Sequence, residues 1–347
     1  MAEKNSIRGS ARRKKQFIKG LTYAALILFG TAFTLPFFWL ISTSFKPAER
    51  IQKWPPDILP MQLQYVQAYG KRHQVFFTKD SKPVIILNRE PGGIIGAMPA
   101  YDRNSKELIM VKQDELTEAV RPGLDWSNYS KGLVFIPFFN QLKNTLIVCI
   151  FSVIGTLLSS SLVAYGLSKI EWKGRNLLFM ILLSTMMLPY QVVMVPVFAI
   201  FVWLGWVDTF LPLIVPTFLG NAFFIFLLRQ FFLTIPKDLS EAAKLDGCSE
   251  FDIYRRIIVP LSKPALAMVG LWTFMGAWNE FLLPLIYLPD ERKYTLSLGL
   301  AMFLGQYGNE YGMLMAVSTV ITIPIIILFF FTQRTFIQGI TMSGIKG

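Results

Sequence analysis

The sequence predicts an all-α membrane protein with six transmembrane helices and a small extracytoplasmic insert that contains β-strands. Hydrophobic residues make up 53% of the 347 residues and charged residues only 16%, which inverts the balance of a soluble globular chain. Several apolar stretches reach about 20 residues, the length that spans a bilayer. These stretches are continuous rather than alternating, which favours helices over the strands of a barrel.

Six segments are long and apolar enough to be spans. They cover residues 21–42, 142–167, 177–204, 208–235, 264–288 and 312–332. The first follows a basic start but has no small-residue cleavage site, so we expect a retained helix rather than a cleaved signal peptide. Several spans contain proline, which a membrane helix tolerates where neighbouring helices or an aqueous cavity satisfy the freed carbonyl groups.

The distribution of basic residues predicts the orientation of these spans. The tail at 1–20 has seven lysines and arginines against one acid, and the loops after the second and fourth spans are also basic, whereas 205–208 has no basic residue. By the positive-inside rule we expect a multi-pass inner-membrane protein with both termini in the cytoplasm. The formal net charge of +12 is then explained by topology and contact with membrane lipid, and no nucleic acid is expected as a partner.

Residues 43–138 form a long polar connection between the first two spans, which we expect outside the cytoplasm. Within its central part, about 61–124, three short runs at 73–79, 82–89 and 106–113 are rich in β-formers and are separated by turn residues. We expect a small antiparallel sheet. Because this region has few aliphatic residues, its core should be thin and should lean on the membrane domain or a partner.

The sequence has no pattern typical of a metal, cofactor or nucleotide site. His73 is the single histidine and is distant in sequence from Cys149 and Cys248, so no spacing resembles a metal site, and no cofactor is expected. A glycine-rich loop of the GxxxxGK[ST] form does not occur. We name no catalytic residue, and any ATPase must be a separate chain.

The most informative stretch, at 235–264, predicts two short helices joined by a glycine. Asp238 with Glu241 is a start signal for the first helix, and Gly247 suits the left-handed residue that ends it. Ser249 with Asp252 repeats the start signal, and Pro260 is expected to stop the second helix at about Val259. We expect a compact cytoplasmic knob of fixed shape. An ordinary capped loop is the alternative on pattern alone.

The same stretch resembles the EAA loop of permease subunits in binding-protein-dependent ABC importers, in the maltose-type branch and its smaller permease. The resemblance lies in Glu241-Ala242-Ala243, Gly247, Ile257 and Val259-Pro260 at the family spacing, with valine where the family usually has leucine. Further segments that look alike are SFKPAERI (44–51), NTLIV (144–148), AYGLSKIEWKGRN (164–176), MMLPYQVVMVP (186–196), FLLRQFFLTIP (226–236), WNEFLLPLIYL (278–288) and GITMSGIKG (339–347). The departure is the insert at about 61–124, where the family has a shorter connection.

This resemblance implies a function, partners and a domain organisation. Such a permease forms half of a pathway for a carbohydrate, together with a second permease subunit, a cytoplasmic ABC ATPase dimer and an extracytoplasmic solute-binding protein. The implied organisation is a cytoplasmic basic tail (1–20), the first span (21–42), the extracytoplasmic segment (43–138), a five-helix core (139–335) with its coupling loop at 236–263, and a cytoplasmic tail (336–347). The residues implied in ATPase coupling are Glu241, Ala242, Ala243, Asp246, Gly247, Ile257 and Pro260.

Glu280, beside Asn279, is an acid near the outer end of the fifth span. An acid at this depth faces the interior of the bundle or water, so the two residues either line the pathway or make hydrogen bonds between helices. Three other functions stay open: a permease for a solute that is not a sugar, a membrane-embedded enzyme and a self-contained secondary transporter. Glu280 has no evident catalytic partner and no internal repeat is visible, which disfavours the last two.

Overall fold

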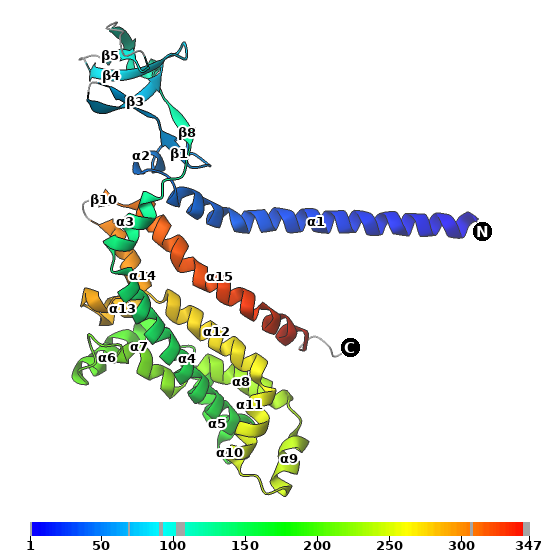
Figure 1. Ribbon diagram of the computed structural model, residues 1–347. Coiled ribbons are helices and arrows are strands. Elements are labelled where there is room, and N and C mark those ends of the chain that lie inside the picture. Colours follow the sequence, from blue (N-terminus) through cyan, green and yellow to red (C-terminus); the bar gives the residue numbers. More distant parts are fainter. Residues whose placement is uncertain (1, 69, 90–92, 102–107, 306–307, 343–347) are drawn as a thin grey trace. The chain divides into compact units, whose positions relative to one another are not determined.

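The computed structural model describes residues 2–68, 70–89, 93–101, 108–305 and 308–342, with side chains from Lys15 to Gln333 outside these gaps and apart from Gly308 and Asn309. The chain divides into two compact units (Figure 1). The first comprises Met1–Gly132 and Gly308–Thr319, and the second comprises Leu133–Tyr307 and Val320–Gly347. The final segment of the expected tail, 343–347, lies outside the described residues.

The first unit combines a long helix with short strands. Its helices are α1 (Ala2–Ser44), α2 (Ala48–Ile51) and the 3-10 helix η1 (Gln113–Glu115). Its strands are β1 (Met61–Leu63), β2 (Tyr65–Ala68), β3 (Lys71–Phe77), β4 (Pro83–Arg89), β5 (Ile94–Pro99), β6 (Ile109–Lys112), β7 (Thr117–Glu118), β8 (Val120–Pro122) and β10 (Gly308–Asn309). Two helices cross the boundary between the units, α3 (Ser127–Phe135) and α15 (Tyr311–Met342).

The expected antiparallel sheet is present in this unit. Its strand order is β2-β3-β4-β5-β6, with β7 paired to β3 and with β1 and β8 in a separate ladder. Val84 and Ile85 are adjacent on β4 and both are buried, in different clusters. Because successive side chains of a strand point to opposite faces, the sheet buries apolar residues on both sides. The core is therefore small but two-sided.

Three strands of this sheet, β2, β5 and β7, were not predicted, and β5 lies where a turn was expected. The stretch from Pro91 to Ser105 was expected to be a turn, yet Ile94–Pro99 within it forms β5. Gly96 of β5 lies opposite Asn88, next to a register shift in β4, and a Cβ at position 96 would overlap the Asn88 side chain. Gly96 thus permits the close approach of two strands.

A buried arginine attaches the sheet to α2. The side chain of Arg50 is 3% exposed, and its guanidinium donates to both carboxylate oxygens of Asp57 at 2.8 Å and to Oε2 of Glu118 on β7 at 2.6 Å. Lys53 Nζ donates to the same Glu118 oxygen at 2.7 Å. These cations hold the pKa of Glu118 below its usual range, with the Lys53 hydrogen bond as the largest cause. The SFKPAERI segment therefore anchors the sheet.

The second unit is helical. Its elements are α4 (Phe138–Ser168), α5 (Arg175–Thr185), α6 (Tyr190–Trp203), α7 (Leu211–Ile214), η2 (Val215–Leu219), α8 (Ala222–Thr234), α9 (Lys237–Leu245), α10 (Glu250–Ile253), the π-helical turn η3 (Tyr254–Ile258), α11 (Val259–Leu261), α12 (Lys263–Asn279), α13 (Leu282–Tyr287), η4 (Glu291–Lys293), α14 (Leu296–Leu300), η5 (Ala301–Phe303) and the strand β9 (Leu304–Gly305).

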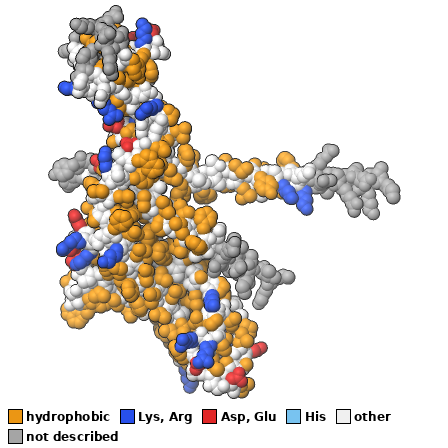
Figure 2. Space-filling model, viewed as in Figure 1, with side chains coloured by type: hydrophobic (Ala, Val, Ile, Leu, Met, Phe, Trp, Pro, Cys, Tyr) orange, Lys and Arg blue, Asp and Glu red, His pale blue; other side chains and the backbone are white. Residues whose placement is uncertain are grey.

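Helix α4 is central in this unit and packs against α8, α12 and η2. Gly155 permits the contact with η2, because a Cβ there would meet Thr217 and Phe218 at less than van der Waals distance. Large apolar side chains of α4, among them Ile150 and Leu158, remain exposed. Figure 2 shows that hydrophobic side chains cover much of the viewed face of the helices. A lipid environment or partner helices would cover such surfaces.

By length and composition, four helices of the described chain can cross a membrane, and two bent helix pairs raise the number to as many as six. The four are Lys15–Ser44, Phe138–Ser168, Leu211–Thr234 and Tyr311–Gln333, and the pairs are Arg175–Thr185 with Tyr190–Trp203 (97°) and Glu250–Leu261 with Lys263–Asn279 (79°). The prediction that 177–204 and 264–288 are each one continuous helix is wrong, because the first contains the 97° bend and the second is divided into α12 and α13.

The 79° bend lies at Ser262, between α11 and α12, and is distinct from the break within 264–288. Proline chemistry explains the breaks within 177–204 and 264–288. A proline has no N–H for the carbonyl four residues earlier, and its ring clashes with that carbonyl. Helix α5 ends at Thr185, four residues before Pro189, and the second break falls at Glu280, four residues before Pro284. The Glu280 carbonyl accepts a hydrogen bond from Ser297 Oγ instead. A side chain from another element thus replaces the missing helical donor.

Candidate functional site

The knob, residues 236–263, shares one hydrophobic core with the membrane helices. Its buried residues Ala243, Ile253 and Ile258 belong to the same cluster as residues of α4, α8 and α12. At the end of α8, the Lys169 Nζ donates to the Ile235 carbonyl at 2.6 Å, which fixes the entry to the knob. The knob is therefore packed onto the helices rather than suspended as a free loop.

The turn between the two helices of the knob is as predicted. Gly247 has a φ of +81°, and α9 ends in a Schellman motif in which the Cys248 N–H bonds the Ala243 carbonyl at 2.9 Å and the Gly247 N–H bonds the Lys244 carbonyl at 3.0 Å. The Ser249 hydroxyl accepts the Asp252 N–H at 3.2 Å and so caps the next helix, as predicted. The Schellman motif and the Ser249 cap together fix the angle between the two helices of the knob.

Two predictions about the helices of the knob are wrong, one about the start of the first helix and one about the end of the second. Asp238 does not cap α9, because Pro236 occupies the cap position in an extended conformation and the helix begins at Lys237. Pro260 does not stop the second helix, which continues to Leu261. The π-helical turn η3 ends at Ile258, two residues before this proline, and the Val259 N–H bonds the Tyr254 carbonyl five residues back. This wider turn carries the helix into the proline without the usual α-helical pairing.

The implied coupling residues divide between the surface and the core of the knob. The exposed ones are Glu241, Ala242, Asp246, Gly247 and Pro260, while Ala243 is buried and Ile257 is half-buried. Two apolar residues beside them were not predicted as part of the site. Leu245 is 90% exposed and Phe251 is 61% exposed. An apolar side chain at the end of a charged, capped helix is a sequence signal that would have found Leu245.

A charge pair bridges the two helices of the knob. Lys244 Nζ on α9 lies 2.7 Å from Glu250 Oε1 at the start of α10. Its hydrogen bond with Glu250 raises the pKa of Lys244. Because both side chains are about half exposed, the pair contributes little to stability. The pair instead helps to position the two helices, since it adds a side-chain link across the Gly247 turn.

Asn279 and Glu280 both bind nearby backbone at the break after α12. Asn279 Nδ2 donates to the Met275 carbonyl at 2.8 Å. The Glu280 carboxylate accepts the Leu283 N–H at 3.1 Å and so caps the first turn of α13. These contacts favour the structural alternative over the pathway alternative for Glu280.

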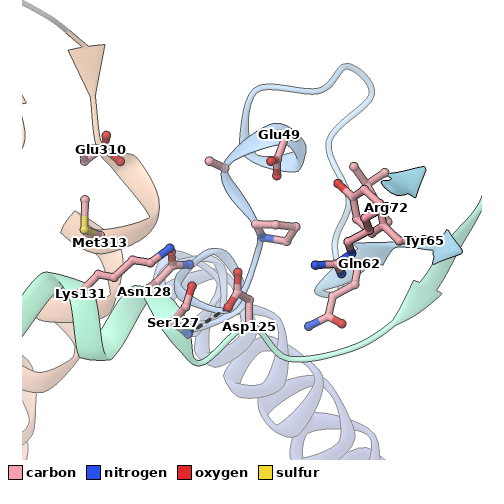
Figure 3. A pocket seen from close by; sticks show the side chains of 13 residues that line it. Glu49, Gln62, Tyr65, Arg72, Asp125, Ser127, Asn128, Lys131, Glu310 and Met313 are labelled. Atoms are coloured by element: carbon pink, nitrogen blue, oxygen red, sulfur yellow. Dashed lines mark hydrogen bonds between the residues drawn. The ribbon is translucent and has the colours of Figure 1, made fainter. Parts of the chain in front are cut away.

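A second group of polar residues lines a pocket within the first unit (Figure 3). The cavity has a volume of about 410 Å³. Its charged lining residues are Glu49 of α2, Arg72 of β3, Asp125, Lys131 of α3 and Glu310. The Arg72 guanidinium lies over the Tyr65 ring at 4.3 Å, and the Asp125 carboxylate accepts the Ser127 N–H at 2.9 Å. A lining with charges of both signs suits a polar partner surface better than a lipid.

The apolar helices, with the capped knob packed against them, define a polytopic membrane protein. Residues 145–341, more than half of the chain, match the family model described as the binding-protein-dependent transport system inner membrane component. The chain belongs to this family. Its members are transport components, which confirms that this chain is not an enzyme.

Curated relatives agree with this membership. The chain is 40% identical over 210 residues to the arabinooligosaccharides transport system permease protein AraQ of Bacillus subtilis. This match covers 60% of this chain and 74% of the relative. The chain is 36% identical over 208 residues to the trehalose/maltose transport system permease protein MalG of Thermococcus litoralis, covering 59% of this chain and 75% of the relative. Both relatives are therefore similar to this chain over about three fifths of its length.

The fold is also similar to a solved structure of a bacterial ABC transporter involved in the import of the acidic polysaccharide alginate. The TM-score is 0.66 at 22% identity, and the match covers 92% of this chain and 97% of that chain. This likeness concerns the fold alone. It extends well beyond the region that the family model matches.

Proposed function

We propose that this chain is one permease subunit of an ATP-driven importer that takes up a carbohydrate. The observation that carries the proposal is the knob, whose Gly247 turn and exposed Leu245 and Phe251 form a rigid, partly apolar projection at the family's coupling motif. Named relatives transport arabinooligosaccharides and trehalose or maltose, which supports a carbohydrate over another solute. A permease for a solute that is not a sugar is the second candidate.

In this proposal the chain has six spans and both termini in the cytoplasm. Helices α5 and α6 together count as one span, and α12 with α13 counts as another. The knob, which contains Glu250–Leu261, lies on the cytoplasmic side with the basic residues of the 169–175 loop. A second permease subunit supplies the other half of the pathway, and a separate ATPase dimer receives the knob. Glu241, Ala242, Asp246, Gly247 and Pro260 face the ATPase, while Ala243 and Ile257 hold the knob to its core.

The sheet and the pocket beside it are proposed to contact the solute-binding protein. The pocket's unlike charges, for example Glu49 and Lys131, suit the polar surface of a soluble protein. The expected cytoplasmic tail at 336–347 is proposed to reach the ATPase. Helix α15 extends through Met342, so most of this tail continues the helix.

Copurification and uptake test the function together. The tagged chain, extracted from its native membranes in mild detergent, should carry an ATPase chain and a second permease in stoichiometric amounts. In proteoliposomes with the cognate binding protein, ATP should drive uptake of a labelled arabino- or malto-oligosaccharide. Purification without any ATPase, or uptake without ATP, would contradict the proposal, and uptake of a solute other than a carbohydrate would favour the second candidate.

A further inference from the structure

Two side-chain hydrogen bonds join the second helix of the knob to α4. The Tyr165 hydroxyl donates to Glu250 Oε2 at 2.6 Å, and the Ser161 Oγ and Tyr254 hydroxyl lie 2.6 Å apart. Ser161 and Tyr165 are four residues apart on α4, and Glu250 and Tyr254 are four residues apart on the knob. Because residues at this spacing share one helix face, the four form a ladder with two rungs. We call it the two-rung ladder.

The ladder is tied into its surroundings. The rings of Tyr165 and Tyr254 have centroids 5.3 Å apart, so the two rungs also touch each other. The second oxygen of Glu250 binds Lys244 Nζ at 2.7 Å, which extends the connection to α9. A single carboxylate therefore joins both helices of the knob to α4.

The hydrophobic cluster under the knob does not by itself fix the knob's register on α4. Apolar contact is non-directional, so packed helices can slide by small steps and keep most of their buried area. A hydrogen bond to a carboxylate is short and angle-dependent, and it breaks when the partners shift by an ångström or two. The two rungs supply the directional part of the attachment.

We propose that Tyr165 and Ser161 are positioning residues that make the knob and α4 move as one rigid body, so that a displacement of the knob is delivered directly to this membrane helix. The proposal rests on the proposed function, because it assumes that an ATPase moves the knob. It assigns a role to the AYGLSK segment, which contains Tyr165, in addition to the motif of the knob. The alternative is a knob that hinges on α4 during the cycle.

Conservative variants test the rungs in the full complex. Tyr165→Phe keeps the ring and removes one rung, and Tyr254→Phe removes the other. We expect each to retain basal ATP hydrolysis and to raise the number of ATP molecules hydrolysed per solute transported by roughly threefold or more, a range typical of residues along a coupling route. Tyr129→Phe is the matched control, because it removes a 2.8 Å hydrogen bond to Ser44 in the first unit. Its ratio should equal that of the wild type.

Crosslinking separates a rigid attachment from a hinge. In a Cys149→Ala and Cys248→Ala background, Ser161→Cys and Tyr254→Cys are joined by a short bis-methanethiosulfonate reagent. Transport that continues after crosslinking supports one rigid body. Transport that stops and returns on reduction shows that the knob moves on α4, which overturns the proposal.

The wild-type complex in the same assay distinguishes a failure of the proposed function from a failure of the two-rung ladder. Absence of ATP-coupled uptake there contradicts the proposed function itself. Coupled uptake in the wild type, with an unchanged ATP-to-solute ratio in both Tyr→Phe variants, contradicts the two-rung ladder alone.

Discussion

At Gly247 the backbone has a φ of +81°, and a Cβ there would meet no atom within 4 Å. The requirement for glycine is therefore conformational and not steric. Valine is β-branched and disfavours positive φ, so Gly247→Val should cost about 1–2 kcal/mol at the turn and change the angle between the helices of the knob. We expect uptake to fall and solute-stimulated ATP hydrolysis to fall with it, at unchanged membrane insertion.

Asparagine at the same position is the matched control. Asn tolerates the left-handed region better than other residues with a side chain, so Gly247→Asn should retain most of the uptake. Equal losses in the valine and asparagine variants would mean that the side chain obstructs a contact with the ATPase. Normal uptake in the valine variant, at wild-type expression, would remove the coupling role from this turn.

The Glu280 carboxylate caps α13 through the Leu283 N–H, and this contact needs an oxygen but not a charge. Glu280→Gln keeps an acceptor oxygen, so we expect uptake close to that of the wild type. Glu280→Ala removes the acceptor and should destabilise the break by about 1 kcal/mol, as for other helix caps, with a lower yield of folded protein. Uptake assays beside size-exclusion profiles measure both effects. Loss of uptake in a well-folded Gln variant would instead assign the charge to the pathway.

Among the elements, those defined by local signals could be predicted from the sequence. Ser249 and Gly247 act on backbone groups within a few residues, so their roles in the knob followed from spacing. The two-rung ladder could not be predicted, because its partners are 85 and 93 residues apart in sequence. Long-range pairs of this kind depend on how α4 and the knob pack, which spacing along one segment does not encode.

The breaks within the spans also could not be predicted from the sequence. Pro196 and Pro324 lie inside continuous helices, whereas Pro189 and Pro284 follow breaks. All four lack an N–H, so their sequence signal is the same. At Glu280, a donor from a distant element, Ser297, satisfies the freed carbonyl. Whether such a donor is present is a property of the tertiary structure.

The Arg50 cluster makes the attachment of the sheet depend on pH. The pKa of Glu118 is lowered in the folded state, so its contribution to stability is complete above its unfolded pKa of about 4.5 and is lost as the pH falls through the folded value. We expect amide exchange in β3 and β7, corrected for intrinsic rates, to be faster at pH 4 than at pH 6.5. Glu118→Gln should remove most of this difference.

Arg50→Met tests the same cluster from the cationic side. It leaves Asp57 without its Arg50 partner and leaves Glu118 with Lys53, and it should destabilise the attachment by about 3 kcal/mol, near the lower limit for a buried ion pair because Glu118 is 35% exposed and keeps one partner. Glu115→Gln, at an exposed carboxylate of η1, is the control and should change neither exchange nor its pH dependence. Unchanged protection of β7 in the Arg50 variant would show that the sheet is held by its apolar core alone.

At the scale of the whole molecule, the strands of the sheet before Pro122 lie outside the region that defines the family, since the family model matches residues 145–341. The sheet pairs its own strands and buries its own core, so nothing in it requires lipid. Its polar, turn-containing backbone is incompatible with the hydrocarbon region. Its side of the membrane follows only from the charge distribution of the spans and loops.

Cysteine labelling tests this topology directly. Asp80 lies in the exposed turn between β3 and β4, and Lys173 is exposed in the connection between α4 and α5. In a variant without the native cysteines, Asp80→Cys should react with an impermeant maleimide in intact cells. Lys173→Cys should react only after the membrane is permeabilised, because its basic loop is expected in the cytoplasm. The reverse pattern would invert every span and place the knob opposite the ATPase side, whereas labelling of both sites in intact cells would mean that the number of spans between them is even.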